Sequence, residues 1–286
     1  MRAKFRREAK TALCFLAPAL CGTMVMTVIP TMDVVRRSFL SAMGSSFVGL
    51  ENFASVLTNE PFLLAVKNTG RFLIVCIPLL LTLSLVTAIL LMRQKRLQDL
   101  FKTTYLLPMV IPVTSVVLII QTVFHKNGLF SALCATFGKT PVDWLNSEYA
   151  FLVLVLCYLW RNFGYNVVLW MAGLATIPDT LYEAARIDGA SELQCFRYIT
   201  IPQLMPTVFM TTVLALINSF KVFREAYLVA GNYPNNSIYM LQHILSNWFT
   251  DLDMQKISAA AVLLLVAILF VVFIIARISA RKGESL

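Results

Sequence analysis

Charged residues interrupt two otherwise apolar runs of the chain, and these residues are the first candidates for chemistry. Arg161 lies in the run 150–176. Lys221, Arg224 and Glu225 lie in the run 206–230, with Arg224 just outside the polar arc described below. Charges within a bilayer are costly and usually face a bundle interior or a water-filled cavity. Placed at 100° per residue, the polar residues of the second run fall within an arc of about 80°. These are Thr211, Asn218, Lys221 and Glu225.

A second polar stripe is expected on the run 150–176. Its members span about 140° on the same construction: Tyr158, Arg161, Asn162, Tyr165 and Asn166. Sugars are bound by hydrogen-bonding side chains together with aromatic faces, so the two stripes predict a path for a polar solute. Two alternatives stay open: the charges could hold two subunits together, or Lys221 and Glu225, four residues apart, could pair within one helix.

Catalytic, metal and nucleotide sites are not predicted. His125 and His243 are isolated in the sequence, and the six cysteines form no C-x-x-C pair, so we expect neither a metal site nor a catalytic residue set. Gly138-Lys139-Thr140 resembles the end of a phosphate-binding loop, but Leu133 stands where the motif requires glycine. We therefore expect no cofactor and no ATP binding by this chain.

The segment 178–206 contains start and stop signals for two short helices. Thr180 with Glu183, and Ser191 with Gln194, have the spacing of capping boxes. Gly189 fits the left-handed position that ends many helices, and Pro202 is expected to stop the second helix. The prediction is a hairpin of helices 181–188 and 192–199. An interfacial hairpin with no partner is an alternative, whereas the few basic residues argue against DNA binding.

The elements that position these residues are membrane spans. The chain is 58% hydrophobic and 14% charged, with a mean hydropathy of +0.75, which indicates an all-α polytopic membrane protein. Six runs have the length needed to cross a bilayer. They cover residues 11–32, 72–92, 103–124, 150–176, 206–230 and 257–276, and one membrane domain at 11–279 accounts for most of the chain. Pro108 and Pro112 predict a kink in the third span.

The distribution of basic residues predicts the orientation. Residues 1–10 and the segments following spans two, four and six hold 14 Lys and Arg residues, against 7 in the opposite loops. Positively charged loops stay in the cytoplasm, so both termini are predicted to be cytoplasmic: a basic segment at 1–10 and a tail at 280–286. The hairpin at 178–206 lies on this cytoplasmic side.

The spacing of the hairpin residues resembles the EAA signature of the membrane subunits of binding-protein-dependent ABC importers. The matching positions are Glu183-Ala184-Ala185, Gly189, Ile199 and Ile201-Pro202, with isoleucine at 201 where the family has leucine. Asp188 and Ala190 resemble the maltose and glycerol-phosphate permease subfamily. So do Phe15 to Ala19, Phe47 to Phe53, and Asn68-Thr69, whereas Gly231 to Pro234 departs from its double-glycine turn.

This resemblance implies a fold, partners and a location. The fold is the six-helix type I importer permease, with a cytoplasmic coupling hairpin between spans four and five that contacts a dimer of separate ABC ATPases. The other implied partners are a second permease, as a heterodimer, and an extracytoplasmic solute-binding protein that delivers a sugar. The location is the bacterial inner or plasma membrane, embedded in the lipid bilayer, with no nucleic acid involved. The coupling residues implied by the motif are Glu183, Ala184, Ala185, Asp188, Gly189, Ala190, Ile199 and Pro202.

Two other functions remain as alternatives. The same class of importer could carry glycerol phosphate or another polar solute. A secondary transporter would explain the charges in the spans, but it would be expected to show repeated hydropathy halves and would have no use for the EAA hairpin.

Overall fold

The computed structural model describes residues 13, 15–42, 44, 46–92, 94, 98–138, 140 and 142–283. The predicted N-terminal segment 1–10 lies outside these residues. The chain divides into two compact units, one comprising residues 1–59 and 247–268 and the other residues 60–246 and 269–286. Each unit is treated separately below.

Within the first unit, a turn after the first span is held by a buried asparagine. Asn52 lies in α3 (Glu51–Leu57), and its side-chain amide donates to the Ser38 oxygen at 2.9 Å and the Leu40 oxygen at 2.8 Å. Phe39 packs against the rings of Phe47 and Phe53, with centroids 6.2 and 5.3 Å away. The residues Phe47 to Phe53, which resemble the permease subfamily, thus form a local structural turn.

Among the described residues, six helical segments are long and apolar enough to cross a membrane. They cover Phe15–Arg37, Glu60–Met92, Val113–Thr136, Ala150–Leu174, Met205–Ala230 and Met254–Ser279. The first contains a π-turn at Met24–Val28 followed by α2 (Ile29–Arg37). The last lies in α15 (Met254–Gly283). The second, α4 (Glu60–Met92), begins 12 residues before the predicted start at 72, because the preceding residues continue the same helical pattern.

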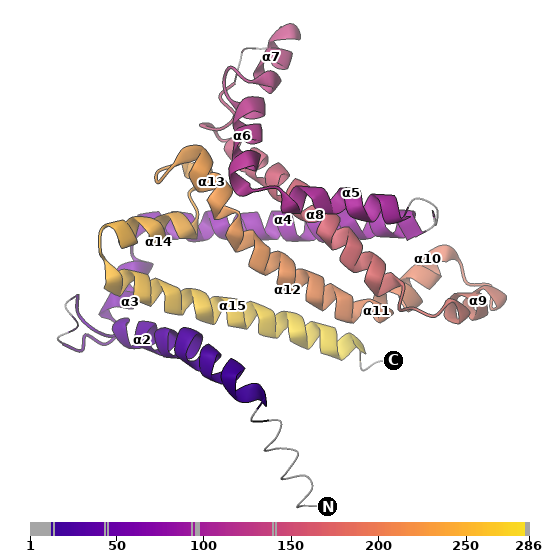
Figure 1. The fold of residues 1–286 in the computed structure, drawn as a ribbon, viewed down its shortest axis with the longest axis horizontal. Coiled ribbons are helices and arrows are strands. Elements are labelled where there is room, and N and C mark those ends of the chain that lie inside the picture. The colour runs from indigo at the N-terminus through magenta and orange to yellow at the C-terminus, as the bar shows by residue number, and fades with distance from the viewer. Residues whose placement is uncertain are drawn as a thin grey trace, which may run out of the picture. The chain divides into compact units, whose positions relative to one another are not determined.

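In the second unit, α8 (Ala150–Leu174) packs along α4 (Figure 1). The buried positions of α4 recur every three or four residues, as expected for a helix with one packed side. Small residues on that face, Ser84 and Ala88, let α8 approach closely. The indole nitrogen of Trp170 donates to the Ser84 hydroxyl at 3.0 Å, which satisfies a polar group inside the bundle.

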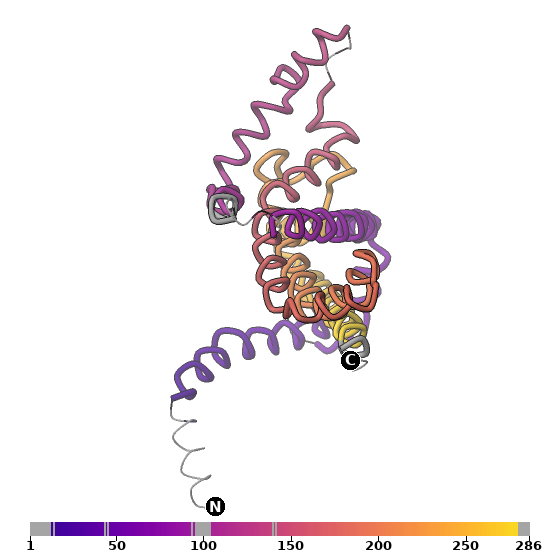
Figure 2. Tube along the Cα trace, turned by 90° about the vertical axis from the view of Figure 1, so that its right-hand side faces the viewer, coloured from indigo at the N-terminus to yellow at the C-terminus, as the bar shows by residue number. Residues whose placement is uncertain are grey.

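The predicted third span at 103–124 is broken rather than kinked. Helix α5 (Gln98–Val110) ends before Ile111, and α6 (Val113–Phe124) begins after Pro112, whose ψ of 141° is extended. Proline cannot donate the next helical hydrogen bond, and it disfavours a helical conformation for the preceding residue. Helix α6 therefore leaves the break in a different direction from α5, and α7 (Leu129–Thr136) follows it (Figures 1 and 2).

A second asparagine ties the segment before α14 (Leu241–Thr250) to the start of α4. The Asn68 side-chain amide donates to the Asn236 oxygen at 2.6 Å and the Tyr239 oxygen at 2.9 Å. The Thr69 hydroxyl accepts from the Leu241 N–H at 3.1 Å. Asn68-Thr69, another subfamily-like pair, therefore fixes a connection between segments far apart in the sequence.

Candidate functional site

A polar pocket of about 210 Å³ lies between α8 and the helices of the fifth span, α12 (Met205–Lys221) and α13 (Phe223–Ala230). Six of the nine predicted path residues line it: Tyr158, Arg161, Asn162, Asn218, Lys221 and Glu225. Met109, Cys157, Val222 and Arg224 complete the lining. The two predicted stripes thus meet at one pocket.

An ion pair between the two stripes forms part of the wall of this pocket. Arg161 Nη1 donates to Glu225 Oε1, and the two side chains are 15% and 6% exposed. A buried charge of either sign is costly without a partner, so each side chain stabilises the other in place. The other carboxylate oxygen, Glu225 Oε2, is buried and has no hydrogen-bond partner. It is an unused acceptor beside the pocket.

The two pairing alternatives raised by the sequence can now be assessed within this chain. Lys221 does not pair with Glu225; its amino group donates to Asn218 Oδ1 at 3.1 Å. Helix α12 ends in a tightened turn, in which the Val222 N–H bonds the Ser219 oxygen only three residues back. Because this turn changes the helical phase, Glu225 faces Arg161 on α8 instead. The buried pair joins two helices of one subunit, not two subunits.

The same change of phase explains a residue that the sequence analysis missed. On a single helical wheel Arg224 falls just outside the polar arc, yet it lines the pocket. No turn residue at Val222 signals the phase change. The only sequence evidence that could have placed Arg224 at the pocket is that it lies close to Lys221 and Glu225 along the fifth span.

Three predicted path residues do not line this pocket. Asn166 and Thr211 are buried in helix packing, with Asn166 donating to the Asn162 oxygen at 2.9 Å and Thr211 to the Thr207 oxygen at 2.7 Å. Tyr165 is half-buried on α8. Tyr158 has a structural bond as well, because its hydroxyl donates to the Ala215 oxygen at 2.7 Å across to α12. A role for these residues in the path stays a prediction.

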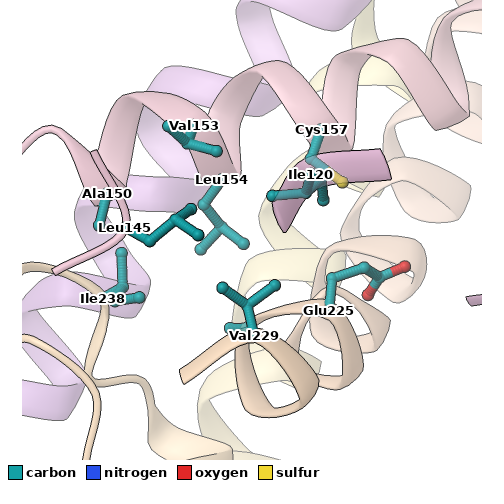
Figure 3. Close-up of a pocket in the computed structure, with 10 residues that line it drawn as sticks. Ile120, Leu145, Ala150, Val153, Leu154, Cys157, Glu225, Val229 and Ile238 are labelled. Carbon is teal, nitrogen blue, oxygen red and sulfur yellow. The ribbon is translucent and has the colours of Figure 1, made fainter. Parts of the chain in front are cut away.

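A smaller apolar cavity of about 20 Å³ adjoins the carboxylate of Glu225 (Figure 3). Apart from this carboxyl group, its lining is apolar, with side chains such as Ile120 from α6, Leu154 from α8 and Val229 from α13. The cavity is too small for a sugar ring. Leu145 and Ile238 also line it.

The predicted cytoplasmic hairpin consists of α9 (Asp179–Ile187) and α10 (Glu192–Cys195), joined at Gly189. Gly189 has φ of +80°, as predicted. Its N–H bonds the Arg186 oxygen at 3.1 Å, and the Ala190 N–H bonds the Ala185 oxygen at 2.9 Å, the Schellman pattern that ends a helix. Small Ala185 and the glycine thus define the sharp reversal between the two helices.

One of the two predicted capping boxes is present. The Ser191 N–H donates to Gln194 Oε1 at 2.7 Å, and the Gln194 N–H donates to the Ser191 hydroxyl at 3.4 Å. The box at Thr180 and Glu183 is wrong, because α9 already begins at Asp179 with Pro178 as its cap. Thr180 is therefore inside the helix and cannot cap it.

The prediction that Pro202 stops the second helix is also wrong. After α10 the chain continues through a π-turn at Phe196–Thr200 into α11 (Ile201–Gln203) and then α12. In the π-turn the Ile201 N–H bonds the Phe196 oxygen, five residues back. This wider turn gives the proline ring space at the start of the next helical segment, where its missing N–H matters least.

The hairpin presents both charge and exposed apolar surface. Glu183, Ala184, Asp188 and Gly189 are exposed, whereas Ala185, Ala190, Ile199 and Pro202 are half-buried. Ile187 is 87% exposed and Leu193 74% exposed, so two large apolar side chains lie on the surface of the hairpin. Inside the hairpin, the hydroxyls of Tyr182 and Thr200 bond at 2.9 Å and join its two arms. The result is a braced hairpin with an open outer surface.

Comparison with known protein families shows which family the chain belongs to. Residues 80–283 match the family described as binding-protein-dependent transport system inner membrane component. The chain belongs to this family. The match includes both the hairpin and the polar pocket, so neither feature is an addition to the domain of these inner membrane components.

Relatives of this inner membrane component are similar over most of the chain. The trehalose/maltose transport system permease protein MalF of Thermococcus litoralis is 29% identical over 269 residues, covering 92% of this chain and 91% of that protein. The xylose/arabinose import permease protein XacH of Haloferax volcanii is 32% identical over 231 residues, covering 79% and 73%. A bacterial ABC transporter involved in the import of the acidic polysaccharide alginate has the same fold. Its TM-score is 0.81 at 19% identity, with 98% of this chain and 99% of that one covered.

Proposed function

We propose that this chain is the membrane-spanning permease of an ATP-driven importer, and that it forms, with a second permease, the path for a sugar or oligosaccharide. The observation that carries the proposal is the glycine-centred hairpin between spans four and five, since it has the EAA spacing and a Schellman turn. The polar pocket and the sugar-transport names of the relatives support a sugar as solute.

In this mechanism the hairpin transmits movement from a separate ATPase to the spans. The exposed apolar side chains Ile187 and Leu193 are suited to contact with another protein, and Glu183 adds an exposed charge beside them. Helix α10 continues through the π-turn and α11 toward α12. A displacement of the hairpin would therefore be transmitted to α12, the helix that bears Asn218 and Lys221. A packed two-state element can transmit such a rigid-body movement.

The direction of transport follows from the proposed orientation. With both termini and the hairpin in the cytoplasm, the loops that face outward would receive the solute from a binding protein. ATP hydrolysis is assigned to the separate ATPase. This chain would form part of the solute path and transmit the movement of the ATPase to the spans.

The left-handed conformation of Gly189 gives a sharp test of coupling. A Cβ atom at this position would meet no other atom within 4 Å, so a substitution acts through the backbone alone. Gly189→Val should open the turn, because β-branched residues disfavour positive φ, whereas Gly189→Asn should retain it. The chain is co-expressed with its cognate ATPase, and co-purification and solute-stimulated ATP hydrolysis are measured.

We expect the valine variant to lose co-purification or solute-stimulated hydrolysis and the asparagine variant to keep both. Glu183→Lys is expected to behave like the valine variant, with Glu183→Gln as its conservative control. Wild-type assembly and coupling in both Gly189→Val and Glu183→Lys would contradict the proposed role of the hairpin.

A further inference from the structure

We infer that the polar pocket recognises a carbohydrate that carries an anionic group, such as a carboxylate or a sulfate. The inference rests on the proposed import of a sugar and adds the charge class of that sugar. It follows from the charges that line the pocket and from how many of them are already neutralised.

The pocket carries an excess of positive charge. Of its four charged residues, Arg161 and Glu225 neutralise each other. Lys221 contacts only a neutral amide oxygen, that of Asn218. In the part of the chain that the structure describes, no carboxylate lies within ion-pair distance of Lys221 or Arg224. Both side chains are exposed, and neither has a counter-charge among the described residues, so an anionic ligand in the pocket would be attracted by two cations.

A hydroxyl-bearing ligand that reached the carboxyl group of Glu225 would satisfy a second group of a residue that lines the same pocket. Glu225 is 5% exposed, and its Oε2 atom lacks a hydrogen-bond partner. A buried acceptor without a donor destabilises the protein, and a sugar hydroxyl is a suitable donor. An inorganic anion would satisfy the cations and leave this acceptor unused. A carbohydrate with an acidic substituent would satisfy both.

The main competing explanation is a counter-charge from the second permease. A carboxylate of that subunit could neutralise Lys221 and Arg224, and the pocket would then favour neutral solutes. The first explanation predicts a positive electrostatic potential in the pocket of the assembled transporter, and the second predicts a potential close to neutral, so a charge-selective reagent distinguishes them.

The experiment measures that potential with a thiol in the pocket wall. Met109 lines the pocket and is 40% exposed, so Met109→Cys is introduced after the six native cysteines are changed to alanine. The assembled, ATP-hydrolysing complex is treated with anionic sulfonatoethyl methanethiosulfonate or cationic trimethylammonioethyl methanethiosulfonate. Relative to a free thiol, we expect the anionic reagent to be favoured at least about tenfold, because two nearby cations attract it.

Charge-removing variants serve as controls. Lys221→Gln with Arg224→Gln should abolish the preference, whereas Lys126→Gln, an exposed lysine outside the pocket, should leave it unchanged. Equal rates for the two reagents, or a faster cationic reagent, would overturn the inference. Because the complex used still hydrolyses ATP, that result would leave the proposed import function standing.

Transport provides the second measurement. With the solute that the complex imports, the double glutamine variant is expected to lower uptake at least about tenfold, while Lys221→Arg retains it because the charge is kept. An imported solute that carries no charge would overturn the inference without contradicting the function.

Discussion

At the scale of single residues, the Arg161–Glu225 pair has two roles, one in helix packing and one in the wall of the pocket. It joins α8 to α13, and it holds one carboxylate oxygen at the pocket while the other is bound. Both side chains are largely buried, so their energies depend on each other far more than those of surface pairs do. The pair therefore stabilises the contact between α8 and α13, and any contact of Glu225 with solute requires that the pair is formed.

This coupling predicts a non-additive response to mutation. Glu225→Leu leaves Arg161 buried without a counter-charge and should destabilise the protein by about 3–5 kcal/mol. Arg161→Met should have a similar effect, whereas the double variant should recover most of the loss. The measurement is thermal unfolding of the purified protein in detergent. Strictly additive losses in the double variant would show that the ion pair does not stabilise the fold.

At the scale of helices, close packing depends on glycine where α5 meets α8. A Cβ atom at Gly164 would lie 1.8 Å from the Tyr105 carbonyl oxygen, a backbone atom that cannot rotate away. The ring of Phe163 packs edge-on against Tyr105 at a centroid distance of 5.8 Å, which fixes the same contact. The direction of α5, and through it the position of Met109 in the pocket wall, therefore depends on the absence of a side chain at 164.

We expect Gly164→Ala to separate the two helices and to lower stability by about 1–3 kcal/mol or more, since overpacking is relieved only by backbone movement. Gly70→Ala is the matched control. Gly70 lies within α4, a Cβ atom there would meet nothing within 4 Å, and alanine favours the helix by about 1 kcal/mol. The unfolding temperatures of both variants provide the test, and an unaffected Gly164→Ala would contradict the close approach.

The helices also show how much the sequence could predict. Apolar length alone predicted six spans, and charge within two of them predicted the pocket-facing residues Arg161 and Glu225. The break at Ile111–Pro112 and the π-turn before Pro202 were not predicted, since proline signals a disturbed helix without specifying whether the chain bends, breaks or continues. Contacts that depend on distant backbone positions, such as the one at Gly164, leave no local pattern.

At the scale of the whole molecule, the proposed topology places every loop on a defined side of the membrane. The basic segments and the α9–α10 hairpin are assigned to the cytoplasm, and the loop between Thr136 and Ala150 and the segment around α14 are assigned to the outside. This assignment is what allows one chain to contact an ATPase on one side and a solute-binding protein on the other.

Reporter fusions test this topology directly. Alkaline phosphatase, which is active only outside the cytoplasm, should be active when fused after Gly138 or Tyr233. It should be inactive after Gly189 or Gly283, where green fluorescent protein should fluoresce. Active phosphatase at Gly189 would contradict the cytoplasmic position of the hairpin and, with it, the proposed coupling.

The ion pair between α8 and α13 also affects how the protein is made. Its two partners are 64 residues apart, so the fourth span must leave the ribosome, and could enter the bilayer, before Glu225 has been synthesised. An isolated arginine at the centre of a span costs about 2.5–3.5 kcal/mol on insertion. The fourth span is therefore expected to remain at the insertion machinery until the fifth arrives, so that the two spans enter the lipid together with Arg161 and Glu225 already paired.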